Sequence, residues 1–385
     1  MRILHTSDWH IGRFLNNYSL LQDQKYFLDW LFFVLKEQKV DLLIVAGDIY
    51  NTASPSSLAV SLLDEFFSRV VLDLKIKLLI IAGNHDSPEK LGFSSKILQR
   101  SGFYIATDLK NIKTIPFEEK NFSIGVTLFP YITPAMVKEE FKEEKISNFD
   151  ETINFVYERY IKENVKYDFN ILCAHGLFLP SSGEDLKFCD SEVEVGGIEA
   201  FNLNLFSEFS YIALGHLHKS QKVGKNARYS GSPIKYSVSE ANDIKGVFLV
   251  DISKEKGVSI EKVNFKPLRD LRVITGNFRE ILKEKSSDYV AVKLTDEDFI
   301  IDPYNRLKEN YPNLLEIEFL NLKLEFKQNF KGLKEIEPNK LFEEFYSYVV
   351  ERKMKEEEIK FLDDVIKKYK LKIIRKVNLD AVKKA

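Results

Sequence analysis

Residues 78–85 of the chain, LLIIAGNH, join four apolar residues to two small ones and then to two polar ones. An apolar run of this length, rich in leucine and isoleucine and without polar alternation, is typical of a strand buried on both faces. Four further stretches repeat the pattern and end in a polar residue: 2–8, 42–48, 170–175 and 211–216. The repeated pattern predicts buried strands that each deliver a polar side chain at their carboxyl end.

Helical patterns separate the first three of these strands. Apolar residues in 19–38 recur with the spacing of one helix face: Phe27, Trp30, Leu31, Val34 and Leu35. Ser54 and Pro55 are expected to open the next helix as its N-cap and first residue. Strands that alternate with helices predict a layered α/β domain, in which ligands bind beyond the carboxyl ends of the strands.

The pattern changes after residue 220. Short strands are expected at 226–231, 245–252 and 257–265, and a small α+β module is expected to follow. From residue 339 onward, apolar spacing predicts two amphipathic helices, marked by Leu341, Phe342, Phe345 and Val349 and by Ile359, Leu362, Ile366 and Tyr369. We therefore expect three parts: 1–265, 266–330 and 331–385.

Composition excludes several classes of protein. The 385 residues are 44% hydrophobic and 30% charged, which excludes a disordered chain. A net charge of −2 excludes a globally basic coat for nucleic acid. The two cysteines, Cys173 and Cys189, exclude a disulfide framework. The charged start and the lack of a long apolar run predict a soluble, cytoplasmic protein without a membrane span.

The polar residues at the strand ends carry imidazole, carboxylate or amide groups, and they are Asp8, His10, Asp48, Asn84, His175, His216 and His218. Such donors without thiolate suit Mn²⁺, with Mg²⁺, Fe or Zn as further candidates. Seven ligands are too many for one catalytic ion with open positions, so they predict two divalent ions that share a carboxylate. The pairs Asp8/His10 and His216/His218 are expected to point the same way on extended backbone.

Three residues near the predicted ligands are given other roles. His85 adjoins a ligand position and is expected to stabilise the transition state or protonate the leaving oxygen of a phosphate ester. Asp86 is expected to hold the tautomer of His85 by a hydrogen bond. His5 lies within its strand, out of phase with Asp8, and is expected to be a core residue.

The stretches HTSDWHIG, AGDIYNT, AGNHDS, AHG and ALGHLHKSQ resemble the calcineurin-like metallophosphoesterases in order and character. The chain is more similar still to the nuclease subunits of bacterial SbcCD-type repair complexes, a similarity that extends to 195–221 and 229–240. This resemblance implies a layered α/β/β/α sandwich with a small α+β capping domain and a C-terminal helical tail.

The resemblance also implies a role for each part. Asp8, His10, Asp48 and His218 would hold one metal ion, and Asp48, Asn84, His175 and His216 the other, with His85 as the catalytic histidine. Residues 266–330 would steer DNA, and 339–370 would dock on the coiled coil of an SMC-like ATPase in a complex with two copies of each subunit. Some relatives carry a second catalytic histidine where this chain has Asn51.

The expected function is a Mn²⁺-dependent DNA nuclease of double-strand-break repair and recombination. By resemblance, it would act as a 3′→5′ exonuclease on duplex ends and as an endonuclease on single strands and hairpins. Two alternatives stay open. One is a metallophosphodiesterase for small phosphoesters, and the other is a scaffold subunit that kept the fold without the chemistry.

Overall fold

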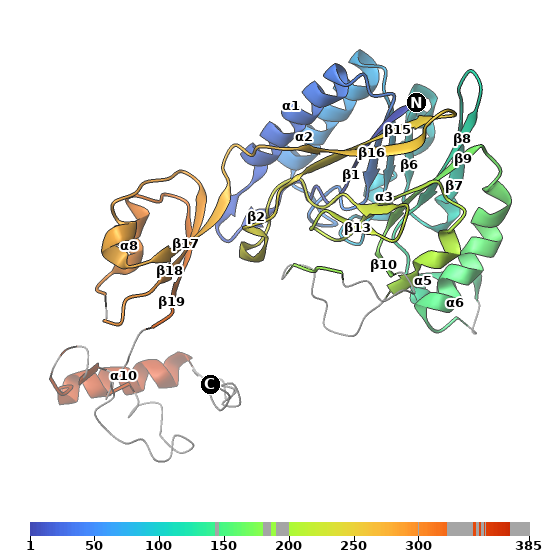
Figure 1. Ribbon diagram of the computed structural model, residues 1–385. Coiled ribbons are helices and arrows are strands. Elements are labelled where there is room, and N and C mark those ends of the chain that lie inside the picture. The colour runs from blue at the N-terminus through green and yellow to red at the C-terminus, as the bar shows by residue number, and fades with distance from the viewer. Residues whose placement is uncertain are drawn as a thin grey trace. The chain divides into compact units, whose positions relative to one another are not determined.

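The structure is a computed structural model, and it describes residues 1–142, 146–179, 186–189, 200–298, 300–321, 342–343, 346–347, 350 and 352–369. The chain divides into two compact units, Met1–Leu322 and Lys323–Ala385. Each unit is described by itself, and Figure 1 shows the elements of both.

The first of two large sheets contains three of the predicted strands. Its order is β16-β15-β1-β4-β5-β6, with bounds Gly257–Asn264, Gly246–Ser253, Arg2–Thr6, Leu42–Ala46, Lys77–Ile81 and Phe103–Ala106. Strands β1, β4, β5 and β6 pair in parallel, whereas β15 and β16 add an antiparallel edge beside β1. The carboxyl ends of β1, β4 and β5 therefore lie at one edge of this sheet.

The second large sheet contains the other two predicted strands, β9 and β12. Its order is β13-β14-β12-β9-β8-β7, with bounds Gln221–Val223, Ala227–Tyr229, Tyr211–Gly215, Phe169–His175, Ser123–Phe129 and Lys113–Glu118. Strands β9 and β12 pair in parallel, and Gly215 lies opposite His175 at their shared carboxyl end. The five motif strands are thus divided between two sheets, a division that their local patterns did not distinguish.

Alternate side chains of the apolar strands explain the layers. Leu43 and Val45 of β4 belong to a core with α1 (Leu21–Glu37) and α2 (Ser57–Ser68), whereas Ile44 and Ala46 lie between the two sheets. In the second sheet, Cys173 faces this central core, and Leu172 packs on the outer side with α6 (Phe149–Val156). These contacts confirm the layered α/β/β/α sandwich and explain why both faces of each strand are apolar (Figure 1).

Helices α1 and α2 can be compared with the helix and the N-cap predicted for this part of the chain. Helix α1 confirms the periodicity of 19–38, but the cap predicted for α2 is wrong by two residues. The hydroxyl of Ser56, rather than that of Ser54, accepts the hydrogen bond from the Ala59 amide. Ser54 is engaged elsewhere, because Lys90 Nζ donates to its hydroxyl over 2.8 Å.

Residues 271–319 form a small parallel sheet with its own core. Its strands lie in the order β17 (Leu271–Gly276), β18 (Tyr289–Leu294) and β19 (Leu314–Phe319). Helices α7 (Phe278–Ile281) and α8 (Pro303–Lys308) form the connections between them. Val290, Val292 and Leu307 are fully buried in this core. We call this unit the three-stranded module. It belongs to the same compact unit as the sandwich, and Arg269 pairs with Asp23 of α1 over 2.6 Å.

The remaining described α-helices and strands are short. They are β2 Phe14–Leu15, β3 Tyr18–Ser19, α3 Pro88–Leu91, α4 Ser95–Leu98, α5 Pro134–Phe141, β10 Leu177–Leu179 and β11 Ala200–Asn202. In the second compact unit, α10 (Glu356–Tyr369) confirms the second tail helix, whereas most of the first predicted tail helix lies outside the described residues. Among the described helices, none combines the length and the apolar character that crossing a membrane requires.

Candidate metal centre

The carboxyl ends of five strands from the two sheets meet at one place. Asp8 follows β1, Asp48 follows β4 and Asn84 follows β5, all in the first sheet. His175 is the last residue of β9 and His216 follows β12, both in the second sheet. The structure therefore brings the predicted ligands together from segments that are more than 200 residues apart in the chain.

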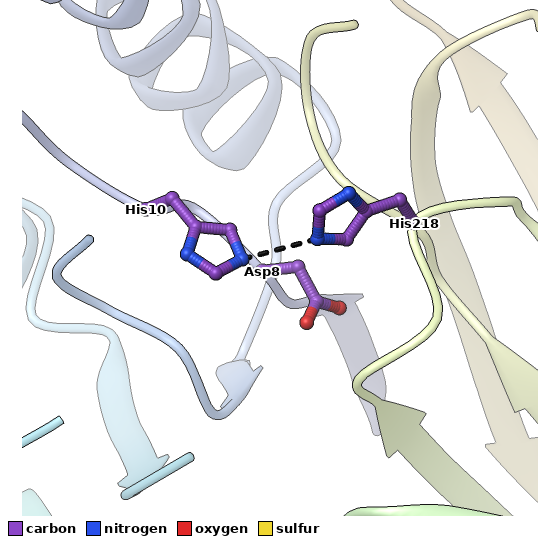
Figure 2. A group of neighbouring side chains, drawn as sticks. All are labelled: Asp8, His10 and His218. Carbon is purple, nitrogen blue, oxygen red and sulfur yellow. Dashed lines mark hydrogen bonds between the residues drawn. The ribbon is translucent and has the colours of Figure 1, made fainter. Parts of the chain in front are cut away.

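Asp8, His10 and His218 form the first group of donors. Figure 2 shows the two imidazoles facing each other, with Nε2 of His10 3.1 Å from Nε2 of His218. The carboxylate of Asp8 lies beside them, and one donor atom from each of the three residues lies within 4.8 Å of the others. All three side chains are buried. Imidazole nitrogens and a carboxylate oxygen that converge in this way can bind a divalent cation.

His175, Asn84 and His216 form the second group. Nε2 of His175 lies 3.0 Å from Oδ1 of Asn84, and Nδ1 of His216 lies 3.3 Å from the same oxygen. Asp48 connects the two groups, because its Oδ2 lies 3.5 Å from Nε2 of His10 and 3.5 Å from Nε2 of His175. The Oδ2 atom of Asp48 therefore lies between the two donor groups, where the oxygen of a carboxylate shared by two ions would lie.

Four of these residues have backbone in the left-handed region, with φ of 53° at Asp8, 43° at His10, 51° at Asp48 and 110° at His216. The expectation of extended backbone at the two i, i+2 pairs is therefore wrong. Hydrogen bonds between loops impose the turn, since the amides of Asp8 and His10 donate to the carbonyls of Gly47 and Asp48. Strained backbone of this kind is concentrated at functional sites, where the surrounding structure must maintain it.

Glycines let the backbone after β5 and at the end of β12 approach the ligands closely. A Cβ on Gly83 would lie 2.1 Å from Oδ1 of Asp48, and one on Gly215 would lie 1.8 Å from the carbonyl oxygen of Ala46. No side chain fits at either position without displacing the backbone. The small residue before each polar one is therefore a steric requirement of the site.

Burial and mutual charge change the protonation of the cluster. Burial raises the pKa of Asp8 to about 7 and lowers the pKa of His216 to about 3. Burial would also lower the pKa of His175, but the negative charge of Asp48 raises it to about 9. The buried Nδ1 of His10 has no hydrogen-bond partner among the described residues. At neutral pH His175 thus retains a proton and Asp8 is protonated in part, and bound divalent cations would replace these protons, so the donor set fits such ions.

His85 and Asp86 differ from their predicted relationship. The ring Nδ1 of His85 lies 3.1 Å from the backbone carbonyl of Asn51, and the Asp86 carboxylate does not bond to this ring. Asp86 instead accepts hydrogen bonds from the amides of Ile49, Tyr50 and Gly83, at 3.1, 2.9 and 2.9 Å. Backbone amides surround the carboxylate because Asp86 is buried between two loops, whereas His85 reaches the surface.

Sequence reasoning missed two sets of supporting groups. The carbonyl of Asn51 orients His85, and a buried pair of Glu240 and Lys245 lies behind His218. A backbone carbonyl leaves no signal in residue identity. Glu240 lies in the stretch 229–240, but its contact with His218 depends on the tertiary fold. His5 is a core residue as expected, with its Nδ1 2.8 Å from the hydroxyl of Tyr211.

Two family models and a curated relative match the chain. Residues 1–220 match the family model of the calcineurin-like phosphoesterases, and residues 267–349 match the model described as the type 5 capsule protein repressor C-terminal domain. The chain is 33% identical over 362 residues to the SbcD subunit of nuclease SbcCD from Staphylococcus epidermidis, which covers 91% of this chain and 94% of that protein. The calcineurin-like phosphoesterase YfkN from Bacillus subtilis aligns with a TM-score of 0.35 at 14% identity, over 68% of this chain and 90% of that one.

The family match spans more than half of the chain, and the similarity to the staphylococcal protein continues through the three-stranded module. The donor groups at the strand ends lie within the matched residues 1–220. The chain belongs to the calcineurin-like phosphoesterase family.

Proposed function

We propose that the chain is the nuclease subunit of an SbcCD-type complex and hydrolyses DNA phosphodiester bonds with two divalent ions, Mn²⁺ foremost. The observation that carries the proposal is the position of Asp48, whose Oδ2 lies 3.5 Å from a histidine of each donor group. The name of the staphylococcal relative, a nuclease subunit similar over 91% of the chain, supports a nucleic acid as the substrate.

The residues of the chain would divide the chemistry between them. The two ions, when bound, would supply Lewis acidity at the phosphate and lower the pKa of water. Asp8, His10, Asp48 and His218 would hold one ion, and Asp48, Asn84, His175 and His216 the other. The Asn51 carbonyl accepts the Nδ1 proton of His85 over 3.1 Å. Nε2 would then carry the second proton of the imidazolium form, which His85 would donate to the leaving oxygen and so return to the neutral ring.

The three predicted parts would divide recognition and assembly. Residues 1–265 would carry the chemistry, 266–330 would steer DNA and 331–385 would bind an SMC-like ATPase. The three-stranded module supports this division because it has a separate apolar core. In the tail, α10 exposes Phe361, of which 71% is accessible, and this apolar group would contact the coiled coil of the ATPase.

A homodimer within a 2:2 complex is the assembly we propose. Leu58 of α2 and Phe93 and Ile97 after β5 are 67%, 79% and 70% accessible. Phe93 lines a hollow together with Val60 and Phe67 of α2. Exposed apolar groups that cluster on a surface mark interaction sites. Substitution of Leu58 and Phe93 by glutamate should halve the mass measured by light scattering, whereas an unchanged mass would place the dimer surface elsewhere.

The decisive experiment measures cleavage of blunt, end-labelled duplex DNA by the purified full chain with Mn²⁺ and then with EDTA. Bis(p-nitrophenyl) phosphate and a hairpin DNA are the parallel substrates. Metal-dependent loss of the DNA label supports the nuclease. Hydrolysis of the small ester alone, with DNA still intact after the ATPase partner and ATP are added, would favour a small-molecule phosphodiesterase. No hydrolysis of any substrate in any arm would favour the scaffold subunit.

A further inference from the structure

A buried ionic network lies behind His218. Glu240 is fully buried, and its Oε2 accepts a hydrogen bond from Lys245 Nζ over 2.6 Å. Its Oε1 accepts from the Tyr236 amide and the Ser237 hydroxyl and lies 3.6 Å from Nδ1 of His218. The carboxylate is therefore surrounded by donors, and one of its neighbours is a predicted metal ligand.

The same network holds the backbone of His218. The His218 carbonyl accepts hydrogen bonds from Lys245 Nζ over 2.8 Å and from the Ser232 amide over 3.0 Å. Lys245 Nζ also donates to the Ser232 hydroxyl over 2.9 Å. His218 is thus held at its carbonyl, the Glu240 carboxylate lies 3.6 Å from its Nδ1, and its Nε2 faces His10.

Burial of two charges is costly, and replacement of such a pair by apolar residues is often neutral or stabilising. Lys245 and Glu240 expose only 4% and 0% of their side chains, so both charges bear this cost. A stabilising role is therefore a weak explanation for this pair. Its position against His218 suggests that it acts on the ligand.

Two of the other three histidine ligands are supported differently. Nδ1 of His175 lies 2.8 Å from the carbonyl of Ala46, a neutral backbone acceptor. Nδ1 of His10 has no partner among the described residues. Among these three rings, His218 is the one whose Nδ1 lies against a buried carboxylate, so its tautomer and orientation depend on a charged side chain that can be substituted.

We propose that Glu240 is a positioning residue of the metal centre, holding the Nδ1–H of His218 so that the Nε2 lone pair faces the ion, with Lys245 keeping Glu240 ionised and in place. This inference rests on the proposed two-ion function. A carboxylate behind a ligating histidine orients the ring and raises its basicity, and loss of such a partner typically weakens metal binding about 10–100-fold.

The test measures Mn²⁺ binding to the full chain by isothermal titration calorimetry, together with the melting temperature of the metal-free protein. E240Q keeps the volume of the side chain and removes its charge. We expect one of two Mn²⁺ sites to weaken about 10–100-fold and the other to stay unchanged. The matched control is D243N, because the carboxylate of Asp243 lies nearby but pairs with Lys219 over 2.9 Å instead of a histidine ring. D243N should bind both ions as the wild type does.

A double variant separates positioning from stability, because E240Q alone leaves Lys245 without its partner. E240Q/K245M removes both charges, so we expect its melting temperature to approach that of the wild type while one Mn²⁺ site stays weak. Wild-type affinity in E240Q or in the double variant would overturn the positioning role. A wild-type chain that binds no Mn²⁺ would overturn the proposed metal centre and this inference with it, which distinguishes the two failures.

Discussion

The metal centre and the three-stranded module differ in the kind of side chain that they bury and in their backbone conformation. The centre buries Asp8, Asp48 and His10 completely or nearly so and sets their backbone at positive φ. The module buries Val290 and Leu307 in an ordinary apolar core. Polar burial and left-handed backbone cost free energy, whereas apolar burial supplies it.

The difference indicates which region is built for chemistry. The sandwich supplies two apolar cores around the first sheet, and these cores stabilise loops that would not keep their conformation alone. The module has no comparable cluster of buried polar groups among its described residues. We therefore expect substitutions at the centre to affect turnover and metal binding, and substitutions in the module to affect stability.

The largest effect is expected at His85. H85Q should lower kcat on duplex DNA by about 10²–10⁴-fold, because a general acid contributes that much to proton transfer. Metal content, measured by mass spectrometry of the intact protein, should stay at the wild-type level because both proposed ligand sets are complete without His85, although its ring lies close to His10 and Asp48. A variant that cleaves at the wild-type rate would remove the proposed role of His85.

A large apolar truncation in the module should have the opposite profile. L307A should destabilise the module by about 2–5 kcal/mol, because Leu307 is fully buried and the change leaves a cavity. Hydrogen exchange of β18 would report this loss, while calorimetry should give unchanged Mn²⁺ affinity. Weaker metal binding in L307A would show that the two regions are coupled and would break the comparison.

Metal removal should affect only the centre. Mn²⁺ at about one hundred times its dissociation constant should stabilise the protein by about 2.7 kcal/mol through linkage. Addition of EDTA should then speed amide exchange in the loops after β1, β4, β5 and β12 and leave β18 unchanged. Equal changes in both regions would contradict a metal effect confined to the strand ends.

The smallest expected effects come from one change made in both regions. G83A should cost at least about 1–3 kcal/mol and weaken metal binding, because its Cβ would lie 2.1 Å from Oδ1 of Asp48. G276A should be neutral or stabilise by up to about 1 kcal/mol, since its nearest neighbour, Ile281 Cγ1, would lie 3.7 Å away. Denaturant midpoints of the two variants measure the contrast, and equal midpoints would contradict the steric argument.

Much of the candidate site could be predicted because its signals are local. An apolar run, a small residue and a polar residue follow one another at β4 and β5, so the strand, the close approach and the donor are adjacent in sequence. The same holds for His175 and His216 at the ends of β9 and β12. Local order sufficed there because parallel strands present their carboxyl ends at the same edge.

Other features could not be predicted because they arise between segments. The hydrogen bond expected between Asp86 and His85 is absent, because the Asp86 carboxylate accepts hydrogen bonds from backbone amides of two loops instead. The N-cap of α2 is Ser56 instead of Ser54, whose hydroxyl accepts a hydrogen bond from Lys90. In each case, a donor from a distant part of the chain bonds to the group for which a local rule predicted a different partner.

The sequence by itself determined the strands, the helices between them and the kinds of donor at the strand ends, because periodicity and residue chemistry act over a few neighbours. Only the tertiary structure decided which sheet each strand joins, the left-handed turns at Asp8 and His10, and the placement of Glu240 behind His218. These features depend on hydrogen bonds and packing between residues far apart in the chain, and no local pattern encodes such contacts.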